Sequence, residues 1–225
     1  MTSKNSPVFI IDLDETFLSV NSFPLWAKYF LFGKFDSLNF IRRNALRIKT
    51  LKLFAERKIF GRDHIYIRDE LHKLWQNIDD KTATRNVCVT LAEKIRPNML
   101  SIHKMIKENE IDAVLASAAA SVYAEPFAGY AGFSHVLATQ AGKPENRGEE
   151  KARRISEFLT EKNWQDRKKI FFTDHLEDMP FIKKCDQLMW FGKESEIEEI
   201  KSSAPELTII HCLNLSDKEL TQQIK

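Results

Sequence analysis

A short apolar segment that runs directly into two aspartates, Val8-Phe9-Ile10-Ile11-Asp12-Leu13-Asp14, constrains the fold of this chain more than any other feature. An uninterrupted apolar run with β-branched residues is typical of a strand buried on both faces of a parallel sheet. Side chains two residues apart on an extended segment point the same way, so we expect the carboxylates of Asp12 and Asp14 to converge. Two like charges at short distance repel unless a cation or a shared proton separates them. The segment therefore predicts an acidic site at the tip of a buried strand.

Composition leaves the class of partner open. The chain has 225 residues, of which 43% are hydrophobic and 29% charged, and this is enough for a globular core with a small second domain. Lys and Arg total 34 against 32 Asp and Glu, so the net charge of +2 favours no partner. Three scattered cysteines without C-x-x-C spacing argue against a disulfide framework. Residues 1–6 lack the apolar core of a signal peptide, no apolar run is long enough to span a bilayer, and we expect a soluble cytoplasmic protein.

Residues 19–95 follow a different pattern, with apolar residues at helical rather than strand spacing. We expect a helical insertion of about four helices there. Helix starts and ends are indicated at Asn21-Ser22 before Pro24, at Gly33, at Gly61, and at Asp79 or Asp80.

The strongest charge bias of the chain lies inside this insertion. Between Lys28 and Arg62 the basic residues are Lys34, Arg42, Arg43, Arg47, Lys49, Lys52, Arg57 and Lys58, against only Asp36 and Glu56. The solvated face of amphipathic helices would explain this bias. Attraction of an anionic substrate or an anionic lipid surface would explain it too, helped by the aromatic residues Trp26 and Phe32, which we expect to be exposed. We expect no nucleic acid partner, because no recognition motif accompanies the charge.

A second apolar segment, from Ile111 to Ser117, also ends in a polar residue. We expect a strand here, followed at once by a helix that starts within residues 118–123. Ser117 would then lie beside the unpaired backbone amides of a helix start, where anions bind readily. An ordinary helix-capping serine explains the residue equally well.

A loop at residues 140–148 precedes a predicted helix at residues 149–162. Lys151 lies in the first turn of that helix, where a cation opposes the helix dipole. A site that must neutralise a phosphoryl group would explain its position. Lys143 in the loop is the competing candidate, and we prefer Lys151 because a lysine on a rigid helix is better preorganised.

The segment Lys169 to Pro180 repeats the design of the first one, with an apolar strand that ends in Asp174. Proline is tolerated in a helix only within the first turn, so Pro180 places Asp178 at or just before a helix start. We expect Asp174 and Asp178 to face the same cavity.

Together these segments resemble the four motifs of the haloacid dehalogenase superfamily, most of whose members are Mg²⁺-dependent phosphatases. The similar segments are Asp12 to Thr16 for motif I, residues 114–139 for motif II with the following helix and strand, Gly148 to Lys151 for motif III, and Asp174 to Asp178 for motif IV. Motif IV departs from the usual pattern, because Thr173 replaces a glycine and His175 a frequent serine. The segment Glu125-Pro126-Phe127 and the strand at residues 135–139 resemble the phosphoserine-phosphatase-like branch.

The resemblance implies an α/β fold with a doubly wound, mainly parallel sheet. Residues 1–18 and 96–225 would form this Rossmann-like core, and residues 19–95 a helical cap of the C1 type. The alternation of strands and helices independently favours a parallel sheet with its ligand at the carboxyl ends of the strands.

The resemblance also implies the chemistry. Mg²⁺ would be held by the Asp12 carboxylate, the Asp14 main-chain carbonyl and Asp174, with Asp178 as ligand or orienting residue. Asp12 would attack the phosphorus of a small phosphate monoester to give an aspartyl-phosphate, and Asp14 would act as general acid and base. The phosphate-binding residues would be Ser117, Thr16 and Lys151.

Two other functions compete with this one. A carbon–halogen dehalogenase shares the fold and the nucleophile, but it needs neither Asp14 nor the pair Asp174 and Asp178. A catalytically weak member could bind a phosphorylated ligand, or an anionic membrane through its basic cap. The altered motif IV is the sequence feature that favours this second alternative.

Overall fold

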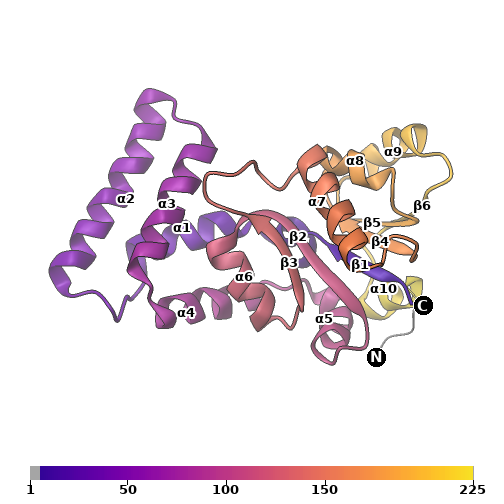
Figure 1. Ribbon diagram of the computed structural model, residues 1–225, viewed down its shortest axis with the longest axis horizontal. Helices are drawn as coiled ribbons and strands as arrows, with labels where there is room; N and C mark the ends of the chain where they lie inside the picture. The colour runs from indigo at the N-terminus through magenta and orange to yellow at the C-terminus, as the bar shows by residue number, and fades with distance from the viewer. Residues whose placement is uncertain (1–5, 225) are drawn as a thin grey trace.

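Six parallel strands form one sheet in the computed structural model of the protein, which describes residues 6–224 (Figure 1). The strands are β1 (Val8–Ile11), β2 (Asp112–Ala120), β3 (His135–Thr139), β4 (Lys169–Thr173), β5 (Gln187–Trp190) and β6 (Thr208–His211). Their order is β3-β2-β1-β4-β5-β6. The chain therefore winds outward in both directions from β1, and the prediction of a doubly wound parallel sheet is confirmed. Residues 1–5, predicted to lack a signal peptide, lie outside the described residues.

Ten α-helices accompany the strands in the described part of the chain. They are α1 (Ser22–Phe32), α2 (Phe40–Phe60), α3 (His64–Ile78), α4 (Lys81–Ala92), α5 (Leu100–Lys107), α6 (Ser121–Tyr130), α7 (Gly148–Glu161), α8 (Met179–Ile182), α9 (Ile197–Ser203) and α10 (Asp217–Gln223). Within residues 6–224, none of them combines the length and the apolar character needed to cross a bilayer.

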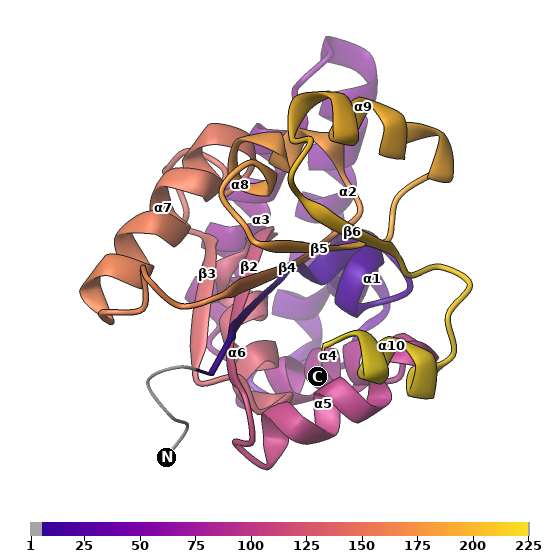
Figure 2. The same cartoon turned by 90° about the vertical axis from the view of Figure 1, so that its right-hand side faces the viewer.

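Alternate residues of β1 point to opposite faces of the sheet, and each face has its own core. Phe9 and Ile11 pack in one cluster with side chains of α5, α6 and α10. Val8 and Ile10 pack in the other with side chains of α7, α8 and α9. Figure 2 shows these two sets of helices on opposite sides of the sheet. Because β1 is buried on both faces, its polar neighbour Asp12 is held at a fixed place at the end of the strand.

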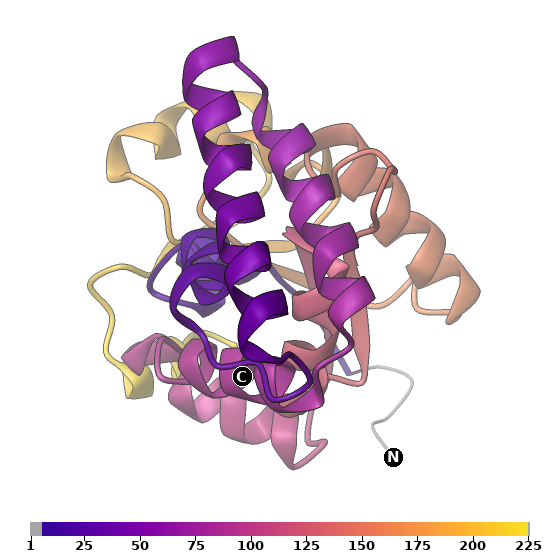
Figure 3. The ribbon, with the colours of Figure 1, turned by 90° about the vertical axis from the view of Figure 1, so that its left-hand side faces the viewer.

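Helices α1 to α4 form the insertion between β1 and β2, and they lie together beyond one end of the sheet (Figures 1 and 3). Their predicted boundaries agree with the structure. The capping residues are Asn21 before α1, Gly33 after it, Gly61 after α2 in the left-handed conformation, and Asp80 before α4. The division into a core and a cap domain at residues 19–95 stays a prediction.

The prediction that Trp26 is exposed was wrong. Its side chain is fully buried, with its ring 6.0 Å from that of Trp75 on α3 and 4.8 Å from that of Tyr123 on α6. Both partners are distant in sequence, so local helical spacing did not reveal the contact. Phe32, the other predicted aromatic residue, is 79% exposed.

The prediction that a helix starts within residues 118–123 agrees with the structure, but the prediction that the strand before it ends at Ser117 was wrong. Strand β2 continues through Ala118 to Ala120, and α6 begins at Ser121. Ala120 pairs with Thr139 of β3 after a shift of register that follows Ala116. Pairing with the neighbouring strand thus overrides the high helix propensity of alanine.

Candidate active site

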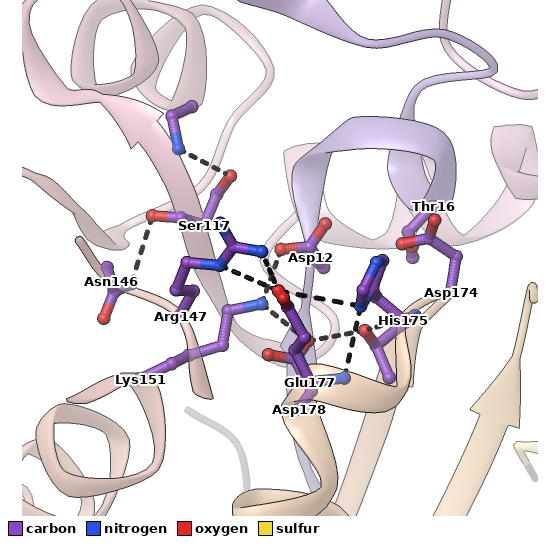
Figure 4. Close-up of polar contacts among 12 residues, drawn as sticks. Asp12, Thr16, Ser117, Asn146, Arg147, Lys151, Asp174, His175, Glu177 and Asp178 are labelled. Carbon is purple, nitrogen blue, oxygen red and sulfur yellow. Dashed lines mark hydrogen bonds and ion pairs between the residues drawn. The ribbon is translucent and has the colours of Figure 1, made fainter. Parts of the chain in front are cut away.

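The predicted site residues meet at the carboxyl ends of the central strands, around a cavity of about 310 Å³ (Figure 4). The ones that line it are Asp12, Asp14, Ser117, Lys151, Asp174 and Asp178. Asp12 follows β1 and Asp174 follows β4, and these strands are hydrogen-bonded neighbours in the sheet. The four motifs, which span more than 160 positions of the sequence, are therefore adjacent in space. Lys143 does not line the cavity.

Lys151 is the buried cation of the site. Its Nζ donates to Asp12 Oδ1 and to Asp178 Oδ2, each at 2.7 Å. The hydroxyl of Thr173 donates to the same Asp178 oxygen at 2.6 Å. Burial lowers the pKa of Lys151, but the carboxylates of Asp12 and Asp178 raise it more, so the net shift is upward and the ammonium group stays charged. The bonds to these two carboxylates explain why a lysine occupies the first turn of α7 despite the helix dipole.

Asp12 is the most strongly perturbed carboxyl group of the site. Burial raises its pKa to about 8, helped by the nearby charges of Asp178 and Asp174 and opposed by Lys151. Three acids thus surround one ammonium group in a region of low dielectric. Such an excess of negative charge favours the binding of a further cation.

Asp14 lies on the turn after β1, where Leu13–Phe17 form a single wide turn with Glu15 at a φ of 52°. Its Oδ1 accepts a hydrogen bond from the backbone amide of Ser22 at 2.7 Å, which fixes the carboxyl group relative to α1. Burial raises the pKa of Asp14 to about 6, although the bonds from Ser22 oppose the rise. A carboxyl group with that pKa can exchange a proton near neutral pH.

Thr16 does not line the cavity, but its hydroxyl donates to Asp174 Oδ1 at 3.1 Å. Burial raises the pKa of Asp174, and this bond opposes the rise. The structure therefore places Thr16 as a partner of Asp174 rather than at the wall of the cavity.

Ser117 lies on β2 with its side chain almost fully buried. Its hydroxyl accepts a hydrogen bond from the amide of Ala119 at 3.1 Å, and Ala118 to Ala120 line the cavity beside it. Asn146 ties this segment to β3, because its Nδ2 donates to the carbonyls of Ser117 and Leu137 at 3.2 and 2.7 Å. The end of β2 after Ser117 is thus tied to β3 and lies beside the cavity.

Several residues at the rim of the cavity were not predicted from the sequence. Arg68 of α3 is buried, and it donates to Glu145 Oε1 at 2.6 Å and to Asp69 Oδ1 at 2.8 Å. Arg147 bonds to Glu177 and lies 3.5 Å from Glu145, so the two arginines share one network of ion pairs. The sequence carried no signal for the pairs Arg68–Glu145 and Arg147–Glu177, because the partners are far apart along the chain.

His175 and His64 also reach the cavity. The Nδ1 atom of His175 accepts from the backbone amide of Glu177 at 3.2 Å, so this histidine caps the short turn ahead of α8. The ring of His64 packs against that of Phe23 at a tilt of 60°, with 4.4 Å between the ring centres. The two histidines thus come from different parts of the fold: His175 from the loop after β4, and His64 from α3 of the insertion.

Oxygen atoms around the cavity are candidate ligands for Mg²⁺. Within residues 6–224, no three His, Cys, Asp or Glu side chains form a metal-binding group by themselves. Mg²⁺ is commonly held by one or two carboxylates, with water and substrate phosphate as the other ligands. Asp12, Asp174 and the main-chain carbonyl of Asp14 supply oxygen donors of this kind, so they fit Mg²⁺. Asp178 Oδ2 already accepts from Lys151 and Thr173, which suits an orienting residue.

Comparison with known proteins identifies the family and the fold. The model of the family described as haloacid dehalogenase-like hydrolase matches residues 9–183. No curated protein matches the chain. A protein of unknown function from Bordetella pertussis Tohama I has the same fold with a TM-score of 0.66 at 14% identity, over 93% of this chain and 99% of that one.

Two further solved structures carry phosphatase names. The phospho-aspartyl intermediate analogue of phosphoserine phosphatase superposes with a TM-score of 0.54 at 13% identity, over 98% of this chain and 100% of that one. A phosphoserine phosphohydrolase-like protein from Francisella tularensis subsp. tularensis SCHU S4 superposes with a TM-score of 0.53 at 14% identity, over 98% and 100%. At these identities the likeness shows a shared fold.

Proposed function

The chain belongs to the haloacid dehalogenase-like hydrolases, and from this premise we propose that it is an Mg²⁺-dependent phosphatase of the phosphoserine-phosphatase-like branch. Its substrate would be a small phosphate monoester. The observation that carries the proposal is the position of Lys151, whose Nζ lies 2.7 Å from both Asp12 and Asp178 at the edge of the cavity. A lysine between two buried acids neutralises charge where a phosphoryl group would arrive.

Asp12 is the nucleophile in this proposal. One of its carboxylate oxygens bonds to Lys151, and the other is available to attack phosphorus in line with the leaving oxygen. The attack forms a covalent aspartyl-phosphate and breaks the bond from phosphorus to the ester oxygen. Water then cleaves the aspartyl-phosphate and regenerates the Asp12 carboxylate.

Asp14 moves the protons. Its pKa of about 6 allows the protonated form to donate to the leaving ester oxygen. The resulting carboxylate then accepts the proton of the water that attacks the aspartyl-phosphate. The bond from the Ser22 amide holds Asp14 on the side of the cavity that faces α1.

Ser117, Lys151 and the amides after Ser117 would bind the phosphoryl oxygens, and Thr16 would orient Asp174. Asp12, Asp174 and the Asp14 carbonyl would hold Mg²⁺, which when bound supplies positive charge that neutralises the phosphoryl oxygens. The second motif I acid and the pair Asp174 and Asp178 have no use in a carbon–halogen dehalogenase, and their presence at the cavity favours the phosphatase.

We also propose a cytoplasmic location, supported by three cysteines that are all buried and free. The substrate is the partner that the site supports, and the basic helix α2 is the surface we propose for a peripheral membrane contact.

The test is Asp12→Asn, assayed with p-nitrophenyl phosphate and Mg²⁺. We expect kcat to fall by at least about a thousandfold, because the amide is a poor nucleophile, while the thermal unfolding temperature shows a folded protein. Asp166→Asn makes the same change on the exposed surface and should leave kcat unchanged. Wild-type activity in Asp12→Asn, or activity that EDTA does not affect, would contradict the proposal. Absence of hydrolysis by the wild type on a panel of phosphate esters would favour the catalytically weak binding protein instead.

A further inference from the structure

Helix α2 exposes a continuous apolar stripe to solvent. Leu46, Thr50 and Leu53 are the buried residues of the helix, and they face α1 and α3. On the opposite side lie five residues that define the α2 stripe: Phe40, Ile41, Ile48, Leu51 and Ile59, which are 75%, 77%, 67%, 56% and 70% exposed. At 3.6 residues per turn they share about 100° of the helix circumference. A helix that served only to cover the protein core would carry polar residues there.

The position of α2 leaves this stripe uncovered. The helix lies at the outer edge of the insertion, farthest from the sheet, and it runs beside α3 along the front in Figure 3. Contiguous exposed apolar surface of this kind marks a site of contact with another molecule or with a membrane.

Basic residues flank the stripe on both sides. By their helical positions Lys52 lies along one edge, with Lys49 and Arg42 farther round the helix on that side, and Arg47 and Lys58 lie along the other edge. Glu56 is the single acidic residue in the sequence of α2. An apolar stripe bordered by lysine and arginine is the pattern of helices that lie in the interface of an anionic bilayer. The charge complements lipid headgroups and would repel a second copy of the same helix.

A second cavity connects this helix with the active site. It has a volume of about 410 Å³, and its apolar walls are formed by Phe23, Ala27, Leu31 and Phe54. Lys28 and Arg57 add positive charge. Helix α2 thus carries both the stripe and part of the cavity wall.

The two cavities share a wall. Asn21, Phe23 and His64 line both of them, and the adjoining rings of Phe23 and His64 form the boundary. A molecule with its phosphate beside Asp12 and Lys151 would direct its leaving group toward these rings. A polar leaving group gains nothing from the apolar space behind them, whereas an alkyl chain is removed from water there.

We propose that the substrate is an amphiphile, a phosphate monoester with a long apolar chain, and that the enzyme takes it from an anionic lipid bilayer on which the α2 stripe lies. The phosphate occupies the cavity at Asp12, and the chain passes the Phe23 and His64 rings into the second cavity. This inference rests on the proposed phosphatase function and names the substrate class for it.

The first experiment measures binding of the full-length protein to vesicles by flotation. Vesicles of phosphatidylcholine mixed with phosphatidylglycerol should carry the protein, and vesicles of phosphatidylcholine alone should carry much less of it. Ile48→Gln combined with Leu51→Gln should weaken binding by at least about tenfold, because two apolar side chains no longer enter the interface. The control is Leu100→Gln combined with Leu213→Gln, which changes two exposed leucines on other elements, 52% and 40% exposed, and should leave binding unchanged.

The second experiment measures kcat/KM for straight-chain alkyl phosphates of increasing length, below their micelle concentrations. We expect kcat/KM to rise about threefold for each added methylene until the second cavity is filled. Leu31→Gln makes the wall of that cavity polar and should flatten the dependence on chain length, which the Leu213→Gln protein should retain.

The results separate this inference from the phosphatase function. Hydrolysis of p-nitrophenyl phosphate with no dependence on chain length would overturn the amphiphilic substrate and leave the phosphatase intact. Failure to float with anionic vesicles, or equal flotation of the stripe variant and the wild type, would overturn the bilayer contact and with it the proposal. A dimer that Ile48→Gln with Leu51→Gln dissociates, seen by size-exclusion chromatography with light scattering, would assign the stripe to a second copy and also overturn it.

Discussion

Replacement of Lys151 by methionine separates the two functions of this residue, in folding and in catalysis. The ammonium group is buried and lies 2.7 Å from carboxylate oxygens of both Asp12 and Asp178. Methionine fills a similar volume without charge, so the change leaves two buried acids without their cation. Breaking a buried ion pair from one side typically costs about 3 to 5 kcal/mol, because the remaining charge stays desolvated.

The loss of unfolding free energy in Lys151→Met should be larger at high pH than at low pH. Burial already raises the pKa of Asp12 to about 8 in the presence of Lys151, which opposes the rise, so its pKa is higher still in the variant. When the pKa of a carboxyl group is higher in the folded than in the unfolded protein, the free energy of unfolding falls as pH rises from the lower pKa to the higher one. We therefore expect Lys151→Met to lose about 3 kcal/mol at about pH 9 and clearly less at about pH 6, where Asp12 is protonated.

Urea unfolding in EDTA, followed by circular dichroism, measures both values. A loss of about 3 kcal/mol moves the midpoint by about 1 M urea or more. Lys183→Met, an exposed lysine beyond α8, serves as the control and should move the midpoint little at either pH. Adding Asp178→Asn to Lys151→Met should recover part of the stability, since one unpaired carboxylate is removed, but none of the lost phosphatase activity. An unchanged midpoint at about pH 9, or wild-type activity in Lys151→Met, would refute the reasoning.

Two further predictions concern buried groups of α3. Arg68→Met should lower the free energy of unfolding, measured in urea, by about 3 kcal/mol, because Glu145 and Asp69 lose a buried partner. The control Arg153→Met removes exposed pairs with Glu150 and Glu157 and should lower it by under about 1 kcal/mol. Equal losses in the two variants would contradict the prediction. His72 is fully buried, and neither of its ring nitrogens is hydrogen-bonded. Burial lowers its pKa below the ordinary 6.5. The free energy of unfolding therefore falls as pH falls below 6.5, by up to about 1.4 kcal/mol per pH unit. His72→Leu should flatten this decline between about pH 7 and about pH 5, and parallel urea curves for the two proteins would show that His72 does not cause it.

Two strands of the core could be predicted because they are short, apolar and followed by a polar residue. Val8 to Ile11 and Lys169 to Thr173 have this form, and both lie in the centre of the sheet. Ala118 to Ala120 could not be assigned, since alanine favours a helix and only pairing with β3 keeps the segment extended. Helix α10 was missed although Ser216 and Glu219 form a capping box that its sequence displays.

The acids of the site could be predicted for the same reason as the strands. Asp12 and Asp174 each follow a buried strand, so the sheet places them at one edge. Arg68 and Arg147 come from a helix and a loop whose positions depend on tertiary contacts, with Glu145 and Glu177 as partners. No local pattern distinguishes such arginines from exposed ones.

Helix α2 shows a different limit of sequence reasoning. Leu46 and Leu53 are buried while Ile48 and Leu51 are exposed, although both pairs are aliphatic and each pair has a spacing, seven or three residues, that puts its members on one helix face. Periodicity identified an amphipathic helix, but a helix with two apolar faces does not say which one packs inward. The buried face is decided by the aromatic residues of α1 and α3, which are far away in the sequence.

The acidic cavity and the α2 stripe are both unfavourable for the protein in isolation. Burial raises the pKa values of Asp12 and Asp14, so holding these groups ionised reduces stability, and the exposed isoleucines and leucine of the stripe reduce solubility. Neither feature improves the packing of the fold. A cation would relieve the first and a lipid surface the second, and local features that disagree with an otherwise consistent fold are expected at functional sites. The second cavity borders the acidic one through Asn21, Phe23 and His64 and takes part of its wall from α2, which suits a substrate with a phosphate at one end and an apolar chain at the other.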